Sequence, residues 1–254
     1  MQKRLLIIAY HWVLCPLILW PGPALAEGPL ALDRANGLTM VQQIKSAGTI
    51  QVSVTKQSVK LSNSKDDMTL LFGPPYKEVI AYSDKQKKIY SCPVGKFNSP
   101  YAITLLTFDE VSFVDLVLSE KESLSYQGLS AKHYGFSKSF AALQRNRFEH
   151  KVSTKRAAMS ADLIAASLLN TDPRVVHFVD SLYSLPPTEG LPLNFEFRNF
   201  TNSNHFYLST HHIAAAKLPE ATFAPPRNYL KVNTLTGLNY DENSRAGIDF
   251  MTEH

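Results

Sequence analysis

Three histidines fall within the segment HFYLSTHH (205–212), and imidazole nitrogens are common ligands of zinc and copper. The alternation of apolar and polar residues predicts that this segment is a β-strand. On a strand, His205 and His211 share a face but lie about 20 Å apart, at ~3.3 Å per residue, whereas His212 points to the opposite face. Because zinc holds each ligand nitrogen at ~2 Å, a metal site would need ligands from distant strands. We therefore interpret these histidines as strand residues and expect neither a metal ion nor a cofactor.

The sequence carries no motif of the common enzyme classes. It has no G-x-S-x-G motif, no phosphate-binding glycine loop and no dinucleotide-binding fingerprint. Cys92, in YSCPVGK, matches no cysteine-protease signature. It is interpreted as a small apolar strand residue, with an intermolecular disulfide or a reactive thiol as the alternative. Asp66 and Asp67 are expected to cap or solvate a turn. We expect that the protein is not an enzyme; a site assembled from distant residues is the alternative.

A basic segment extends from Lys138 to Arg156, with aromatic side chains between the cations and Glu149 as its acid. Such a segment can contact anionic lipid headgroups or a membrane partner. The alternative, which we favour, is a solvated rim of the sheet. The net charge of the whole chain is +4, which is too small to indicate a nucleic-acid partner.

The N-terminus has the pattern of a secretory signal peptide. Lys3 and Arg4 precede a mostly apolar run, and Ala24-Leu25-Ala26 has the small residues of a signal-peptidase site. The apolar run is short for a membrane span and is interrupted by prolines. We predict that residues 1–26 are a signal peptide and that the protein is exported, most simply to the periplasm; a secreted or cell-surface location is the alternative. Lipidation at Cys15 is the less favoured interpretation.

Alternation with a period of two dominates the rest of the chain and predicts β-strands. Polar and glycine- or proline-containing turns separate these segments, which favours an antiparallel arrangement. The predicted strands are 49–55, 58–62, 68–72, a hairpin over 78–92, 111–120, 129–136, 146–154, 192–200 and 205–214.

Two segments are predicted to be helices. Residues 36–47 have apolar side chains at helical spacing. Residues 171–186 have Asp172 as a helix cap, a proline at the first helical position and one apolar face, with His177 on the solvated side. Together the elements predict an α+β fold: a large curved antiparallel sheet, or half-barrel, with a few packed helices.

The order of the elements and a late motif resemble the bacterial lipoprotein-carrier group that includes LolA, LolB and LppX. The KKIYSCP strand after a hairpin and the segment AKLPEATFAPPRNYLKV (216–232) carry the resemblance. The family pattern is followed by Leu218-Pro219-Glu220, Phe223, Pro225-Pro226, Tyr229 and Val232, with Asn228 where glycine is usual. The resemblance implies a half-barrel with an apolar, helix-lidded inner face, and we place one such domain over 27–238. The stretch 239–254 lacks periodicity and is expected to be a flexible tail. The helix in 171–186 departs from a plain carrier.

The resemblance also implies a function: an exported, non-enzymatic module that binds a lipid, a lipoprotein acyl chain or another apolar ligand. Each methylene that such a ligand buries contributes ~0.8 kcal/mol. The alternative is an envelope structural or interaction protein in which the same residues fill a closed core. The candidate cavity-lining residues lie on the last predicted hairpin: Leu193, Phe195, Phe197, Phe206 and Leu208.

Overall fold

The computed structural model describes residues 35–45, 47–101, 113, 116–149, 158–166, 170–199 and 204–239. The predicted signal peptide (1–26) and residues 240–254 of the predicted tail lie outside the described residues. Among the described residues, no helix is long and apolar enough to cross a bilayer.

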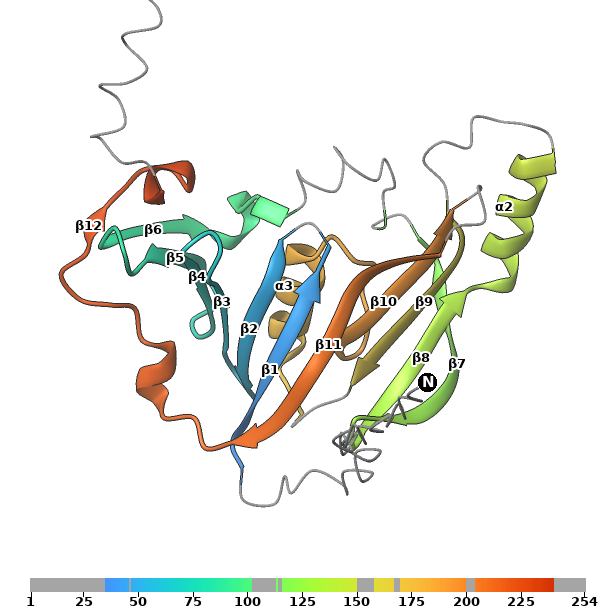
Figure 1. Cartoon of the computed structure of the whole chain (residues 1–254), viewed down its shortest axis with the longest axis horizontal. Helices are drawn as coiled ribbons and strands as arrows, with labels where there is room; N and C mark the ends of the chain where they lie inside the picture. Colours follow the sequence, from blue (N-terminus) through green and yellow to red (C-terminus); the bar gives the residue numbers. More distant parts are fainter. Residues whose placement is uncertain are drawn as a thin grey trace, which may run out of the picture.

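One curved, unclosed sheet of 12 strands forms the molecule (Figure 1). All neighbouring strands are antiparallel except β12, which pairs parallel to β6. The predicted α+β half-barrel is confirmed. The strand order is β12-β6-β5-β4-β3-β2-β1-β11-β10-β9-β8-β7. The bounds are β1 Gly37–Ile44, β2 Gly48–Thr55, β3 Val59–Asn63, β4 Met68–Phe72, β5 Glu78–Ser83, β6 Lys88–Pro93, β7 Leu118–Tyr126, β8 Leu129–Phe136, β9 Ala158–Ala166, β10 Leu191–Asn199, β11 Asn204–Ala216 and β12 Leu230–Lys231.

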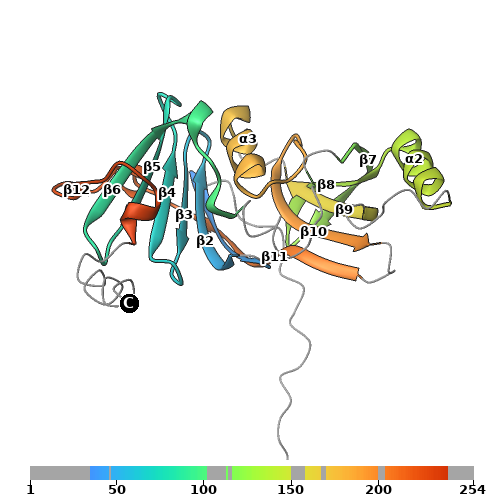
Figure 2. The ribbon, with the colours of Figure 1, turned by 90° about the horizontal axis from the view of Figure 1, so that it is seen from above.

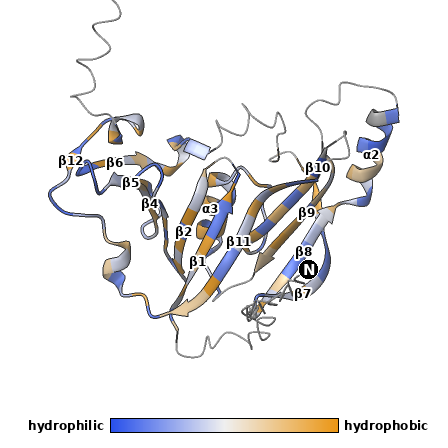
Figure 3. Ribbon diagram, viewed as in Figure 1, coloured by the Kyte–Doolittle hydropathy of each residue, from blue (hydrophilic) through white to orange (hydrophobic). Residues whose placement is uncertain are grey.

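Side chains alternate between the two faces of the sheet, and one face carries the hydrophobic core. In β2, Ile50, Val52 and Val54 are buried while the residues between them are partly or fully exposed. Figure 3 shows the same alternation of hydrophobic and hydrophilic residues along β10. We call the core-bearing face, against which helix α3 packs, the inner face. Burying each large aliphatic side chain there contributes ~1.5–3 kcal/mol.

Helix α3 (Pro173–Leu182) forms where the sequence predicts it. The Asp172 carboxylate accepts from the Arg174 backbone N–H at 2.9 Å, and proline occupies the first helical position. Its apolar face, which includes Val175 and Val179, belongs to the core of the sheet. Figure 2 shows α3 between the β2–β6 side of the sheet and the β7–β10 side.

A buried hydrogen-bond network joins the C-terminal end of α3 to the strands. The Tyr183 hydroxyl donates to Gln42 Oε1 at 2.7 Å, and the Tyr207 hydroxyl donates to the Tyr183 carbonyl at 3.0 Å. Gln42 Nε2 in turn donates to the Pro192 carbonyl at 2.9 Å and to Thr210 Oγ1 at 3.2 Å. The network satisfies polar groups that would be costly to bury alone, so α3 is held in one position on the inner face.

The segment 36–47, predicted as a helix, is instead strand β1. Leu38, Met40 and Ile44 point inward and are buried, and the strand pairs with both β2 and β11. The apolar stripe that suggested a helix included Val41, which lies on the other face and is only partly buried. Pairing on both sides therefore overrides the local pattern.

The predicted strand 146–154 is also wrong over its described part, because residues 138–149 form helix α2 (Lys138–Glu149). Ser137 begins this helix: its Oγ accepts from the Phe140 N–H at 3.2 Å, and its carbonyl accepts from the Ala141 N–H at 2.9 Å. Strand β9 was not predicted. Of the predicted strand 111–120, residues 118–120 belong to β7, residues 116 and 117 precede it, and residues 111, 112, 114 and 115 lie outside the described residues. The other predicted strands are confirmed to within one or two residues at their ends, 78–92 as the β5–β6 hairpin and 205–214 as part of the longer β11.

Residues 217–239, which we call the C-terminal strap, run from beside the start of β1 to the β6 edge of the sheet (Figure 1). Asn36 and Leu218 exchange two hydrogen bonds at the start of the strap, and the ring of Tyr229 meets that of Tyr82 edge-on at 6.0 Å. The family-like motif lies in this strap. Asn228, which stands where glycine is usual, has φ +64°, and asparagine tolerates this left-handed conformation better than most residues.

Candidate functional site

An apolar cleft of about 410 Å³ opens on the inner face, between α3 and the segment that follows β6. The volume falls within the ~300–1,000 Å³ typical of ligand sites. The segment after β6 includes the short 3-10 turn η2 (Val94–Lys96). The cleft is lined by Phe72, Tyr76, Val94, Phe97, Ser99, Arg174, His177, Phe178, Ser181 and Leu182.

Aromatic rings form the floor of the cleft. Phe178 of α3 stacks on Phe72, at the end of β4, with ring centroids 4.5 Å apart, and lies 6.1 Å from the ring of Phe97. Tyr76 continues the row at 5.7 Å from Phe72. These contacts place several aromatic rings side by side, so the floor offers a ligand a continuous apolar surface.

Arg174 lies at the mouth of the cleft and is held from two sides. Its Nε and Nη2 donate to the two oxygens of Asp172 at 2.9 and 2.7 Å. Its guanidinium lies over the Tyr76 ring at 3.7 Å from the centroid. The hydrogen bonds from Arg174 hold the pKa of Asp172 well below its usual value, so this carboxylate stays ionised. Burial and the Asp172 charge raise the pKa of Tyr76.

Further polar groups line the same side of the helix. His177 and Ser181 follow Arg174 at helical spacings of three and seven residues, and both are exposed. On the opposite wall, Val94 is 41% exposed, which places an apolar side chain at the opening. The cleft therefore combines an apolar floor with a polar, cationic edge.

Most of the predicted cavity-lining residues lie in the closed core. Leu193, Phe195, Phe197 and Leu208 are at most 3% exposed. The ring of Phe113 covers two of them, at 4.9 Å from both Phe195 and Phe197. None of these residues lines the cleft between α3 and η2, and their assignment to a ligand stays a prediction.

The expectation that Phe206 shares a face with Leu208 is wrong. A bulge shifts the β10–β11 register, so that Leu208 pairs with Phe195 but Phe206 pairs with Glu196. Phe206 is 61% exposed, and Tyr207 takes the buried position beside it. An extra residue in one strand moves every following side chain to the other face. The assumption of strict alternation therefore placed Phe206 on the wrong face of the sheet.

The histidines of β11 do not converge. The strand is confirmed, but a second bulge lies between His212 and Thr210 where β11 pairs with β1, and His211 and His212 are both exposed. His205 stacks on Phe197 at 5.1 Å. Within the described ranges, no group of three or more histidine, cysteine or acidic residues could hold a metal ion.

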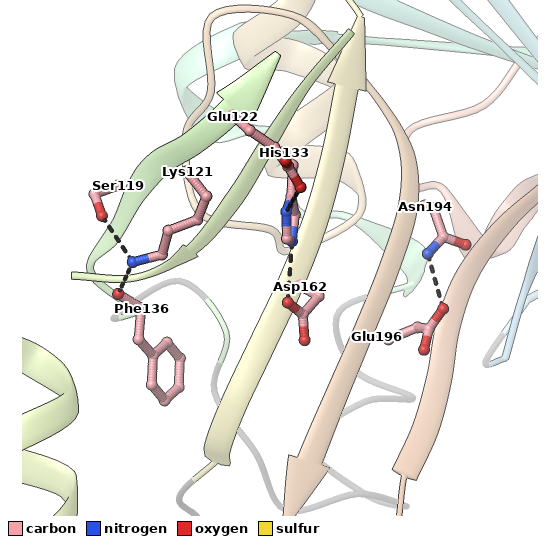
Figure 4. Close-up of polar contacts among 8 residues, drawn as sticks. All are labelled: Ser119, Lys121, Glu122, His133, Phe136, Asp162, Asn194 and Glu196. Carbon is pink, nitrogen blue, oxygen red and sulfur yellow. Dashed lines mark hydrogen bonds and ion pairs between the residues drawn. The ribbon is translucent and has the colours of Figure 1, made fainter. Parts of the chain in front are cut away.

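A second polar region crosses the strands at the β7 side of the sheet (Figure 4). His133 on β8 contacts Glu122 on β7 through Nδ1 at 3.4 Å and Asp162 on β9 through Nε2 at 3.0 Å. Nearby, Lys121 Nζ donates to the Phe136 carbonyl at 2.6 Å. These contacts link neighbouring strands of the sheet, and we interpret the region as structural.

The residues of the cleft come from segments far apart in the sequence, which is why they were not predicted together. Phe72 ends β4, Phe97 follows η2, and Phe178 lies on α3. His177 was expected to be solvated, and it is exposed, but it also lines the cleft. The one local signal was the edge of the α3 apolar face, where polar and aromatic residues meet.

The buried free thiol does not line the cleft, and the basic segment lies away from it. Cys92 is 6% exposed in β6, as expected of a small apolar strand residue. Helix α2, the described part of the basic segment, lies at the far end of the sheet from β6 in both Figure 1 and Figure 2. Membrane contact through Lys138–Arg156 stays a prediction.

No protein-family model and no curated protein matches this sequence. Among solved structures, an uncharacterized conserved protein from Thermus thermophilus is similar, with 10% identity, 80% of this chain and 93% of that chain covered, and a TM-score of 0.41.

The group that the sequence resembles is also represented among the similar structures. A LolA superfamily protein from Nitrosomonas europaea has 5% identity, coverage of 74% and 88%, and a TM-score of 0.23. A putative outer membrane lipoprotein-sorting protein domain from Vibrio parahaemolyticus has 11% identity, coverage of 74% and 87%, and a TM-score of 0.16.

Proposed function

We propose that this protein is an exported, non-enzymatic binding module that holds an apolar chain, such as a lipid or lipoprotein acyl chain, in the cleft between α3 and η2. The observation that carries the proposal is the row of aromatic rings along the cleft, with exposed Val94 at its opening. The predicted signal peptide supports export, to the periplasm in the simplest case.

The cleft suits a chain rather than a polar metabolite. Its floor is formed by side chains that offer van der Waals contact, and the polar groups lie at one edge. Each methylene of a ligand that leaves water there gains ~0.8 kcal/mol, so about fifteen buried methylenes give micromolar binding when immobilisation costs about 4 kcal/mol.

The alternative, a structural or interaction protein with a filled core, is favoured by a different observation. Over β10, the inner face is covered by Phe113, and over β1 by the end of α3. In that part of the half-barrel, the apolar residues of the inner face pack against other side chains of the protein. The carrier proposal therefore concerns the cleft at the β4–β6 side alone.

Binding of a neutral fluorescent probe, N-phenyl-1-naphthylamine, tests the proposal. Ser181 is exposed and lines the cleft, so Ser181→Trp fills the space without disturbing the core. We expect the wild-type protein to bind the probe and enhance its fluorescence, and Ser181→Trp to lose at least ten-fold in affinity.

The matched control is Ser139→Trp, the same substitution at an exposed serine of α2. It should bind the probe like the wild type, and circular dichroism should show that both variants are folded. Absence of probe binding by the wild type, or equal binding by all three proteins, would refute a ligand cleft at this position.

A further inference from the structure

We infer that the ligand of this cleft is an amphiphile with an anionic headgroup, a phosphate or a carboxylate, which Arg174 and His177 hold at the mouth while its chain lies along the aromatic floor. The inference rests on the proposed function and specifies the chemical class of its ligand.

Arg174 is fixed in place before any ligand arrives. Asp172 engages its Nε and Nη2, and the Tyr76 ring supports the guanidinium plane from one side. Nη1 makes no hydrogen bond to Asp172, so its two N–H groups can serve an acceptor at the mouth. An arginine held by a carboxylate and an aromatic ring loses little conformational entropy when it binds an anion.

The other groups at the mouth favour the same charge. His177 lies one helical turn from Arg174 and is exposed, and Ser181 adds a hydroxyl one turn further. Lys96, between the lining residues Val94 and Phe97, is exposed as well. No carboxylate is among the described residues that line the cleft, and Asp172 beside it is already bonded to Arg174.

The order of these groups matches the shape of an amphiphile. From the mouth inward, the Arg174 guanidinium is followed by Tyr76, then Phe72, then Phe178 and Phe97. A headgroup at Arg174 therefore places the first carbons of its chain over Tyr76 and the remainder against the phenylalanine rings. A neutral headgroup would leave the Nη1 donors without a charged acceptor.

Displacement of N-phenyl-1-naphthylamine by ligands with the same twelve-carbon chain tests the inference. Dodecyl phosphate, dodecanoate and neutral monododecanoylglycerol are compared below their micelle-forming concentrations, together with inorganic phosphate. We expect the wild type to bind at least one of the two anionic amphiphiles about ten-fold more tightly than the neutral one, since hydrogen bonds to charged groups are the stronger ones. The ratio of the dissociation constants of dodecyl phosphate and dodecanoate shows which of the two headgroups, phosphate or carboxylate, the cleft prefers.

The variants Arg174→Gln and His177→Gln should lower that preference while leaving monododecanoylglycerol binding unchanged. Arg145→Gln, at an exposed arginine of α2, should behave like the wild type. Equal binding of anionic and neutral ligands by the wild type would overturn the inference but leave the carrier proposal standing. The inference would also be overturned if inorganic phosphate displaced the probe as strongly as dodecyl phosphate does. If the wild type bound neither the probe nor any of the ligands, both the inference and the carrier proposal would be refuted.

Discussion

Asp180 is a buried ionisable residue of α3 that makes the free energy of unfolding depend on pH. It is 2% exposed, and its Oδ2 accepts from the Thr188 N–H at 2.9 Å. Burial raises the pKa of this carboxyl to about 8, although the hydrogen bonds from Thr188 act in the opposite direction. The group is thus neutral in the folded protein at pH 5–7.

This raised pKa predicts that the protein becomes less stable as the pH rises from about 4 to about 8. In that window the folded state keeps a proton that the unfolded chain releases, so the free energy of unfolding falls, by up to ~1.4 kcal/mol per pH unit. Asp180→Asn removes the ionisation. Between pH 5 and 8, the melting temperature of the wild type should fall with rising pH, and that of Asp180→Asn should fall much less. Parallel plots of melting temperature against pH for the two proteins would contradict the raised pKa of Asp180.

At the scale of single elements, α3 depends on the buried contact between Tyr183 and Gln42. Tyr183→Phe leaves Gln42 Oε1 without its 2.7 Å donor, and an unsatisfied buried acceptor costs about 1–3 kcal/mol. The free energy of unfolding is measured by urea denaturation for Tyr183→Phe, Gln42→Leu and the double variant. The double variant should lose less of this free energy than the two single variants lose in sum. Additive losses would mean that the two side chains are not coupled.

The start of β1 leaves no room for a side chain beside the C-terminal strap. A Cβ at Gly37 would lie 2.6 Å from the Val54 carbonyl oxygen and 2.6 Å from Leu218. Gly37→Ala is therefore expected to lower the free energy of unfolding by about 1–3 kcal/mol. Gly95→Ala is the control, because nothing lies within 4 Å of its Cβ. Equal urea midpoints for the two variants would argue against this close approach.

Elements with a strong local pattern could be predicted from the sequence, whereas those that depend on neighbours could not. The alternation in β2 and the cap of α3 are local features, and both were predicted. Strand β1 was not, since Leu38, Val41 and Ile44 fit a helix equally well until β2 and β11 are known. Strand β9 contributes Ala161 and Ala165 to the core, and small alanines between two strands give no clear strand signal.

At the scale of the whole molecule, the half-barrel could be predicted but its cleft could not. Antiparallel order follows from short strands and turn residues, and the resemblance carried by the late motif implied a half-barrel. The cleft, however, depends on where α3 and η2 lie relative to β4. The predicted lining residues Phe195 and Leu208 instead pack in the core, because Phe113 and α3 cover the inner face there.

We propose that the cleft of this protein carries an apolar chain. Native mass spectrometry of the protein, purified from its own host without detergent, is the direct test. We predict that the wild type and Ser139→Trp carry a non-covalent hydrophobic ligand at a stoichiometry near one, identifiable after extraction, and that Ser181→Trp carries none. A wild-type protein at its bare polypeptide mass, or the same bound mass in all three proteins, would contradict the account.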